Sequence, residues 1–352
     1  MLEVVEHRGD ADEAADFAIA CWRASYAGKS YYPLWDRAHF AWQLFDVPDP
    51  RAICRMGAYL DGRLVGFLAA EAMRFRTPAG EVRGTMSSWL SVAPDQSGRG
   101  VGAALHRAMW AWQREQGCAF MIGFVDTGTL RGKGRGFWTR QVPDATIHRK
   151  PLLWTHVIDR RAAGAAEPSR LQALGIGLMA AVQRRAQPSG HFAVRNYADA
   201  DFADVRTIFD RLQARAEFGY LWDDARLRHQ ISGGPITRTL VLDRGHGAEA
   251  FANFTALTLM RRQPLRTQVM DFAGAGAAAE SLLPAFLRAC FDRLRSEDAG
   301  DAVLALGSPV HAGAMLRAGG MLPLPPAQAM IHLPVAADAR MPPVPHLLVH
   351  WR

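Results

Sequence analysis

The chain has 352 residues, of which 49% are hydrophobic and 21% charged, and its formal net charge is +7. These proportions exclude a disordered or low-complexity chain, and the length favours two domains at roughly 150 residues each. No apolar run reaches the ~18–20 residues of a membrane helix. Residues 1–8 (MLEVVEHR) carry charge where a signal peptide is apolar. We therefore expect a cytoplasmic protein without a membrane partner.

The positive charge is divided unevenly along the sequence. Residues 1–158 have 19 basic and 16 acidic side chains, residues 159–190 have 5 and 2, and residues 191–352 have 17 and 16. A nucleic-acid-binding protein concentrates its basic residues on one face or stripe. The densest excess here lies in the middle segment instead, so we expect no nucleic-acid partner.

The cysteines and histidines do not predict a metal site. The cysteines form neither a CxxC pair nor a Cys/His ligand pattern, so we expect reduced and mostly buried thiols. They are Cys21, Cys54, Cys118 and Cys290. His148 and His156 lie on a predicted pair of strands near the end of the first domain without a third ligand, which favours a structural role.

Two segments of the sequence predict the same order of elements. Each is expected to run strand, helix, hairpin, strand, helix, strand, and Asp61-Gly62 marks the first hairpin as a tight turn. In the first segment these elements are expected at 2–6, 12–26, 58–75, 84–92, 102–116 and 119–125. In the second they are expected at 192–196, 199–214, 240–259, 266–272, 281–294 and 302–306. The offset of 180 to 190 residues indicates an internal duplication.

Residues 159–190 are interpreted as a linker between a first domain, 1–158, and a second domain, 191–352. Both ends of the linker are rich in residues that break regular structure. Between them Ser169 would cap a helix that runs to about Ala186. The apolar positions of this helix indicate that it packs on one of the domains.

The most informative segment joins the strand that ends at Val92 to the following helix. Pro94 stops the strand, and Gly98, Gly100 and Gly102 follow at alternate positions. Such glycines let backbone N–H groups converge beside the positive end of a helix, which is a ready site for a pyrophosphate. A Walker loop is excluded because no Gly-Lys-Ser/Thr follows. A dinucleotide fingerprint is excluded because the glycines lie in mid-domain with the wrong spacing.

The stretch Ser97-Gly98-Arg99-Gly100-Val101-Gly102 resembles the acetyl-CoA loop of the GNAT superfamily of N-acetyltransferases, whose pattern is Arg/Gln-x-x-Gly-x-Gly/Ala. Ser97 stands where the family has Arg or Gln, and Gln96 precedes it. The resemblance covers residues 1–158 in element order and residues 191–352 more faintly. It implies a mixed α+β fold of two tandem GNAT-like domains. Each would have a mostly antiparallel sheet, splayed between its fourth and fifth strands and flanked by helices, and the second would be a degenerate copy.

The resemblance also implies that the first domain binds acetyl-CoA or another acyl-CoA as co-substrate, without a metal. The pantetheine arm would lie between the splayed strands, and a backbone N–H there would polarise the thioester carbonyl. The diphosphate would rest on the N–H groups after the strand. The residues expected to contact the co-substrate are Leu90, Ser91, Val92, Gly98, Arg99, Gly100, Val101, Gly102 and Ala103.

The acid and base residues common in GNAT proteins have no direct counterpart here. The family often carries a Glu on one splayed strand and a Tyr on the following helix, and this sequence has Gly123 and Trp138 there. Asp126, at the end of its strand, is a candidate base or acceptor anchor, or alternatively a turn residue. Ser88, two residues before Leu90, is a candidate to hold a water, or alternatively a buried hydroxyl.

Two further features have open interpretations. The aromatic run Tyr31 to Trp35 follows the first helix, where GNAT proteins often build an acceptor lid. It would line a pocket for an apolar acceptor or a longer acyl chain, or would belong to the core. In the second half Gly274 and Gly276 follow the equivalent strand, but Pro284 places the helix start near residue 281 and so away from these glycines.

The expected function is acyl-CoA-dependent N-acyl transfer to a primary amine of a small molecule or protein, by direct attack in a ternary complex. The partners would be the acyl-CoA and the amine or peptide acceptor, and a homodimer is left open. Two alternatives remain. One is a CoA-binding sensor or scaffold without turnover, and the other is an aminoacyl-transfer enzyme on the same doubled fold.

Overall fold

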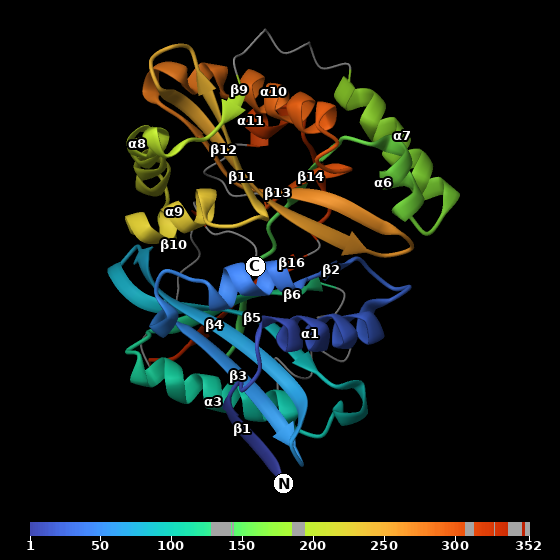
Figure 1. Cartoon of the computed structure of the whole chain (residues 1–352), viewed down its shortest axis with the longest axis vertical. Coiled ribbons are helices and arrows are strands. Elements are labelled where there is room, and N and C mark those ends of the chain that lie inside the picture. The colour runs from blue at the N-terminus through green and yellow to red at the C-terminus, as the bar shows by residue number, and fades with distance from the viewer. Residues whose placement is uncertain are drawn as a thin grey trace.

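The computed structural model describes residues 1–127, 142, 144–184, 194–306, 313–326, 328–336 and 347–348 of the chain. It has two halves, each with a mixed sheet and flanking helices, and Figure 1 shows them one above the other with the N-terminus at the far end of the lower half. This is the mixed α+β arrangement that the sequence predicts. No helix in the described ranges is long and apolar enough to cross a membrane.

The predicted element order is confirmed in the first half. The Asp10 carboxylate accepts hydrogen bonds from the N–H groups of Asp12 and Glu13 and so caps the first helix. Asp61 and Gly62 have φ angles of 51° and 81°, as the tight turn of the predicted hairpin requires. The elements are β1 (Leu2–Glu6), α1 (Ala11–Tyr26), β2 (Tyr32–Leu34), α2 (Arg37–Phe40), the π-helical turn η1 (Ala41–Phe45), η2 (Pro50–Ala52), β3 (Ile53–Leu60), β4 (Arg63–Thr77), β5 (Gly80–Val92), η3 (Pro94–Gln96), α3 (Val101–Glu115), β6 (Phe120–Asp126), β7 (Thr146–Arg149) and β8 (Leu153–Val157).

The second half repeats this order with additional short elements. Its last predicted strand, at 302–306, is found at those residues. The elements are β9 (Val194–Asn196), η4 (Asp199–Asp201), α8 (Phe202–Ala214), β10 (Phe218–Tyr220), α9 (Asp224–Ser232), β11 (Thr237–Asp243), β12 (Ala248–Met260), β13 (Pro264–Ala275), η5 (Ala277–Leu282), α10 (Leu283–Ser296), β14 (Ala302–Leu306), α11 (Gly313–Ala318), β15 (Leu322–Leu324), β16 (Gln328–Pro334) and β17 (Leu347–Leu348). The helix α10 begins at Leu283 with proline in its first turn, near the predicted start.

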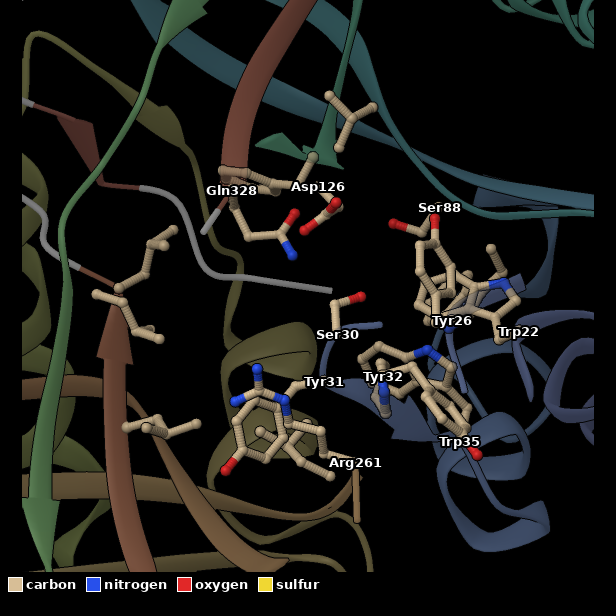
Figure 2. A pocket seen from close by; sticks show the side chains of 18 of the residues that line it. Trp22, Tyr26, Ser30, Tyr31, Tyr32, Trp35, Ser88, Asp126, Arg261 and Gln328 are labelled. Atoms are coloured by element: carbon tan, nitrogen blue, oxygen red, sulfur yellow. The ribbon is translucent and has the colours of Figure 1, made fainter. Parts of the chain in front are cut away.

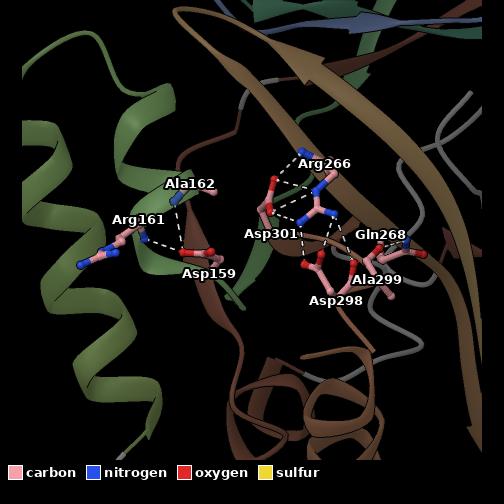
Figure 3. Close-up of polar contacts among 8 residues, drawn as sticks. All are labelled: Asp159, Arg161, Ala162, Arg266, Gln268, Asp298, Ala299 and Asp301. Atoms are coloured by element: carbon pink, nitrogen blue, oxygen red, sulfur yellow. Dashed lines mark hydrogen bonds and ion pairs between the residues drawn. The ribbon is translucent and has the colours of Figure 1, made fainter. Parts of the chain in front are cut away.

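The predicted linker contains a helical hairpin. It consists of α6 (Arg160–Ala166) and α7 (Arg170–Arg184). Ser169 Oγ accepts a hydrogen bond from the N–H of Gln172, which confirms the predicted cap. Asp159 caps α6 in the same way, by accepting from the N–H groups of Arg161 and Ala162 (Figure 3).

The hairpin is attached to the second sheet through β8. The side-chain amide of the buried Gln183 of α7 accepts a hydrogen bond from the N–H of Val157 and donates one to the carbonyl of Thr155. It therefore satisfies backbone groups of β8 as a paired strand would. At the end of β8 the N–H of Asp159 donates to the carbonyl of Asp301, whose carboxylate binds Arg266 (Figure 3). The helix therefore packs on the molecule, as its apolar positions predict.

The two sheets exchange strands. In the first sheet the order is β1-β3-β4-β5-β6-β16-β7, with β10 paired to β4, and in the second it is β15-β8-β14-β13-β12-β11-β9, with β2 paired to β12. The strand β16 therefore completes the first sheet, and β8 completes the second. Each exchanged strand covers the outer edge of a strand that is otherwise paired on one side, β6 or β14, which removes an open edge. The sheets are thus composed differently from the sequence segments 1–158 and 191–352.

A shared aromatic core joins the halves. Phe75 of β4 and Phe120 of β6 pack against Phe218 of β10, with ring centroids 5.5 and 5.6 Å apart. Tyr220 lies against Phe75 at 4.9 Å. All four side chains are buried, and such aromatic contacts contribute beyond the area that they remove from water. The halves therefore form one packed body.

His156 of β8 is buried as a neutral ring. Its Nδ1 lies 2.8 Å from the Gly320 carbonyl and its Nε2 lies 3.2 Å from the Arg295 guanidinium, so we assign the proton to Nδ1. The ring stacks on Phe291. Burial lowers the pKa of His156 from 6.5 to about 4, against the opposing effect of the hydrogen bond to Gly320. The structural role that the sequence predicts for this histidine agrees with these contacts.

The His156→Gln variant tests this assignment through the pH dependence of unfolding. Because the folded pKa lies below the unfolded one, the neutral ring favours folding above pH 6.5, and this contribution is lost as the pH falls toward 4. The variant should be less stable at neutral pH, but its free energy of unfolding should depend on pH less steeply in this window, by about one proton. Urea unfolding at a series of pH values measures both, and an unchanged slope would contradict the assignment.

Candidate functional site

The central feature of the site is a break in the pairing of β5 with β6. These parallel strands pair only from Gly84 with Phe120 to Ser87 with Gly123, and they diverge beyond that point. A Cβ at Gly123 would lie 2.9 Å from the Ser87 carbonyl oxygen, so glycine permits the last close approach. The predicted splay between these two strands is confirmed.

A β-bulge lies directly beyond the break. On β4 Phe67 faces Ser91 and Ala69 faces Ser88, so Trp89 and Leu90 oppose a single residue. Trp89 has a φ of 60°, which is unusual for a bulky side chain and is found where surrounding structure enforces it. A bulge leaves main-chain groups outside the ladder. The bulge therefore offers backbone hydrogen-bonding groups at the open side of β5.

The glycine loop forms an open cradle at the N-terminus of α3. Gly98 and Gly100 have φ angles of 80° and 84°, and a Cβ at either would meet nothing within 4 Å. No side chain caps the helix and its first turn has no acidic residue. Within the described residues, none of five N–H groups donates to a protein acceptor: those of Gly98, Gly100, Val101, Gly102 and Ala103. Unsatisfied N–H groups at a positive helix end fit a phosphate.

The one carboxylate of this loop is held by its neighbours. Gln96 donates to Asp95, and Arg63 forms an ion pair with Asp95 at 2.6 Å. The hydrogen bonds from Gln96 and Arg63 lower the pKa of Asp95. Arg99 is exposed at the cradle. The charges around the loop therefore do not oppose an anion.

A mainly apolar cavity of about 570 Å³ lies at the splay, between the diverging ends of β5 and β6 and the second half. One wall comes from β5 and β6, and another comes from β12, β13 and β14 of the second half, with Leu259, Leu265 and Leu304. The hairpin α6–α7 supplies a third wall through Ala163 and Ile176. The cavity thus joins both halves and the connector.

Both candidate catalytic residues line this cavity. Ser88 and Asp126 lie on the two diverging strands, and Figure 2 shows their side chains on opposite sides of the same space. Asp126 is paired in register with Gln328 of β16, and Figure 2 shows the two side chains directed toward each other. Gln328 was not predicted, because the sequence gives no sign that β16 crosses to the first sheet.

Two neighbouring residues that were predicted to contact the co-substrate, Leu90 and Ser91, are placed differently. Leu90 lines the cavity beside the bulge. Ser91 is different, because its hydroxyl accepts a hydrogen bond from Trp22 Nε1 at 3.0 Å and is buried against α1. Only the main chain of Ser91 is therefore suited to contact a ligand. Trp138, considered for the position of the family tyrosine, lies outside the described residues.

The predicted aromatic cluster lines the cavity from the side of α1. Tyr31, Tyr32 and Trp35 all contribute, and Tyr32–Leu34 pairs with β12 of the second half. Tyr31 donates to Glu167 at 2.9 Å, and Glu167 forms an ion pair with Arg261 at 2.7 Å. Burial raises the pKa of Tyr31, and the charge of Glu167 adds to this. Figure 2 shows Tyr31 beside Arg261, which places a polar cluster at this end of the cavity.

The second half repeats the splay but not the cradle. β13 pairs in parallel with β14 only from Thr267 to Val269, and a register shift leaves Asp271 as an extra residue. The Asp271 carboxylate accepts hydrogen bonds from Thr255 and Gln230. Gly274 lies within β13, where a Cβ would come within 2.8 Å of Leu212. This glycine therefore serves packing of α8 on the sheet.

The comparison with protein families decides the assignment of the first half. Residues 13–140 match the model of the acetyltransferase (GNAT) family. The match places a GNAT domain at residues 13–140 of the sequence. No curated protein matches the sequence as a whole or in part.

Solved structures share the fold of the whole chain. The N-myristoyltransferase of Saccharomyces cerevisiae with bound myristoyl-CoA is similar with a TM-score of 0.66 at 13% identity, over 94% of this chain and 82% of that one. The same enzyme with myristoyl-CoA and inhibitors has a TM-score of 0.70 at 13% identity, over 95% and 80%. A probable N-acyltransferase of unknown function from Enterococcus faecalis V583 has a TM-score of 0.56 at 11% identity, over 96% and 74%. The GNAT domain thus lies within a two-domain GNAT-like fold.

The Gly123→Ala variant tests the close approach at the splay. Its Cβ would press on the Ser87 carbonyl, so we expect a loss of about 1–3 kcal/mol in the free energy of unfolding. Gly175→Ala on α7 is the control, because a Cβ there meets nothing within 4 Å and alanine favours a helix. Thermal and urea unfolding compare the two, and equal effects would argue against the close contact.

Proposed function

We propose that the chain is an acyl-CoA-dependent N-acyltransferase that moves an acyl group to a primary amine of a small molecule or protein. The observation that carries this proposal is the set of three features along β5 and the start of α3: the apolar cavity that Trp89 and Leu90 line, the bulge at Trp89, and the amide cradle of α3. A thioester substrate with a diphosphate at one end and an acyl group at the other matches that sequence of polar and apolar surroundings. The GNAT domain supports the same reaction.

Each group of residues in the site would have a separate role in the reaction. The N–H groups from Gly98 to Ala103 would hold the diphosphate, and a main-chain N–H at the bulge would polarise the thioester carbonyl. Asp126 would remove a proton from the ammonium form of the acceptor, and Ser88 would hold a water across the splay. The neutral amine would then attack the carbonyl carbon, the C–S bond would break, and the thiolate would leave and take up the proton that the attacking nitrogen loses.

The cavity supports a substrate with an apolar portion. Its walls are mainly aliphatic and aromatic, and its volume of about 570 Å³ exceeds what an acetyl group occupies. The structurally similar N-myristoyltransferase was solved with myristoyl-CoA bound. We therefore propose that a longer acyl chain occupies the cavity, with acetyl-CoA as the short donor for comparison, and that the enzyme acts in the cytoplasm.

The Gly100→Glu variant tests the cradle, with Gly117→Glu as a matched control. Both glycines have positive φ, both leave open space for a Cβ, and they lie at opposite ends of α3. Both variants therefore carry the same backbone strain. Only Gly100→Glu places a carboxylate where the diphosphate would lie, so it should weaken CoA binding about a hundredfold.

Isothermal titration calorimetry with CoA measures this difference. The control should bind CoA within about twofold of the wild-type protein, since its new charge lies at the far end of the helix. Equal binding by Gly100→Glu and wild type would remove the cradle from the site. Equal weakening in both variants would assign the effect to strain in α3.

The Asp126→Asn variant tests the proposed base. A panel of amines with acetyl-CoA and longer acyl-CoA donors, followed by detection of the released thiol, gives kcat and KM. The variant should lose about 10²- to 10³-fold in kcat with little change in KM for the donor. Asp16→Asn, an exposed aspartate of α1, is the control and should leave both constants unchanged.

The same assay with the wild-type protein distinguishes an acyltransferase from a CoA-binding sensor without turnover. Thiol release above background with any amine supports the transferase. Clear CoA binding without release from any donor and amine pair would overturn the enzymatic proposal and favour the sensor. Full activity in Asp126→Asn would keep the transferase but remove Asp126 from proton transfer.

A further inference from the structure

The outer face of α7 is an exposed apolar stripe. Leu171, Leu174, Leu178 and Val182 are 79, 70, 69 and 49% exposed. Their spacing of three and four residues places them on one side of the helix. They account for four of the seven large hydrophobic side chains that are exposed in the described ranges. Figure 1 shows α6 and α7 at the outer edge of the upper half.

The opposite face of the same helix is already used. Ile176 and Ala180 pack into the core, and Gln183 binds the backbone of β8. A helix that is apolar on all sides is ordinarily buried on all sides. Here one apolar side is covered by the protein and the other is left in solvent. The uncovered side therefore points to an external partner.

The charges around the stripe identify the chemistry of that partner. Arg160, Arg161 and Arg170 are exposed, and none forms an ion pair with a described residue. From residue 168 to residue 198 the sequence has no Asp or Glu. The acidic side chains close to these arginines are engaged elsewhere, because Glu167 binds Arg261, Asp159 caps α6, and Asp298, which shares a surface hollow with Arg160 and Arg161, binds Arg266. The surface beside the stripe is thus positive.

Arg160 lies close to the stripe. Its Cδ is 3.9 Å from where a Cβ of Gly177 would stand, so the Arg160 side chain lies against α7. A helix with leucines on its outer face and arginines at its borders has the character of an interfacial helix. In such helices the apolar side chains enter the acyl boundary and the basic ones meet lipid phosphates.

We propose that the α6–α7 hairpin docks the protein on an anionic lipid surface, with α7 lying in the plane of the interface. A second copy of the chain fits less well, because the same arginines would meet without acidic partners. Four side chains are also far fewer than the roughly 20–30 residues that each partner contributes to a standard protein interface. The sequence predicts no membrane partner because no apolar run is long enough to span a bilayer, but an interfacial helix needs no such run.

The docking surface is connected to the cavity through the same hairpin. Ile176 of α7 and Ala163 of α6 line the cavity from inside, while the leucines of α7 face outward. Docking would hold the apolar cavity within one helix diameter of the lipid. The proposal does not rest on acyl transfer, because it is argued from the outer face alone.

Vesicle flotation with the full chain tests the docking. The wild-type protein should float with vesicles of phosphatidylcholine mixed with phosphatidylserine, and less with phosphatidylcholine alone, and added salt should weaken the binding. The double variant Leu174→Glu/Leu178→Glu should lose on the order of tenfold of the bound fraction, because two carboxylates replace apolar anchors. Ile147→Glu is the control: this residue of β7 is 53% exposed and lies outside the hairpin, so its flotation should match the wild type.

Circular dichroism and thermal unfolding check that the variants fold. We expect them to fold because the substituted positions are exposed. Failure of the wild-type protein to float with anionic vesicles overturns the proposal, and so does equal flotation of the double variant. A solution dimer that Leu178→Glu dissociates, without vesicle binding, would assign the stripe to a contact between copies. CoA affinity measured without lipid reports on the proposed function separately, so the two proposals can fail independently.

Discussion

The parallel pairing of β5 with β6 ends after Ser87 and Gly123, and the whole candidate site depends on this break. Main-chain groups in the middle of a sheet must find partners, because leaving them unsatisfied and buried is costly. The bulge at Trp89 turns such groups away from β4 at the same level. The gap between such strands is stable when water or a ligand forms hydrogen bonds with its unpaired main-chain groups. This favours a ligand with its own donors and acceptors over a purely apolar one.

The open slot also requires that the diverging strands cannot close on each other. β4 holds β5 on its outer side, and β16 holds β6 over its full length, from Asp126 with Gln328 to Phe120 with Pro334. β6 therefore pairs over more residues with a strand of the second half than with β5. The aromatic core around Phe120 and Phe218 fixes this arrangement further. The second half thus helps to hold the slot of the first half open.

Local features of the sequence predict much of the first half. The Asp61-Gly62 turn and the glycines before α3 act within a few residues, so their patterns can be read directly. The exchange of β8 and β16 cannot be read this way, because an alternating apolar strand fits the edge of either sheet equally well. Gln328 reaches the cavity through that exchange, and Arg261 reaches it from the turn after β12 of the second half, so neither follows from a local pattern. The splay itself was predicted through the resemblance to a family, and the strain at Trp89 has no local signal.

Comparison of the two sheets separates the features of the splay that both sheets share from those that only the first sheet has. Its strands β13 and β14 also pair briefly and then diverge, and Asp271 stands as an extra residue like that of the first bulge. There, however, Thr255 and Gln230 satisfy the carboxylate from within the protein, and Gly274 packs under α8. The second sheet therefore keeps the diverging strands, but its own side chains occupy the hydrogen-bonding groups and the space that a ligand would use. In the part of the chain that the structure describes, the open amides of α3 in the first half have no such internal partner, and this contrast is the strongest structural argument for a bound anion there.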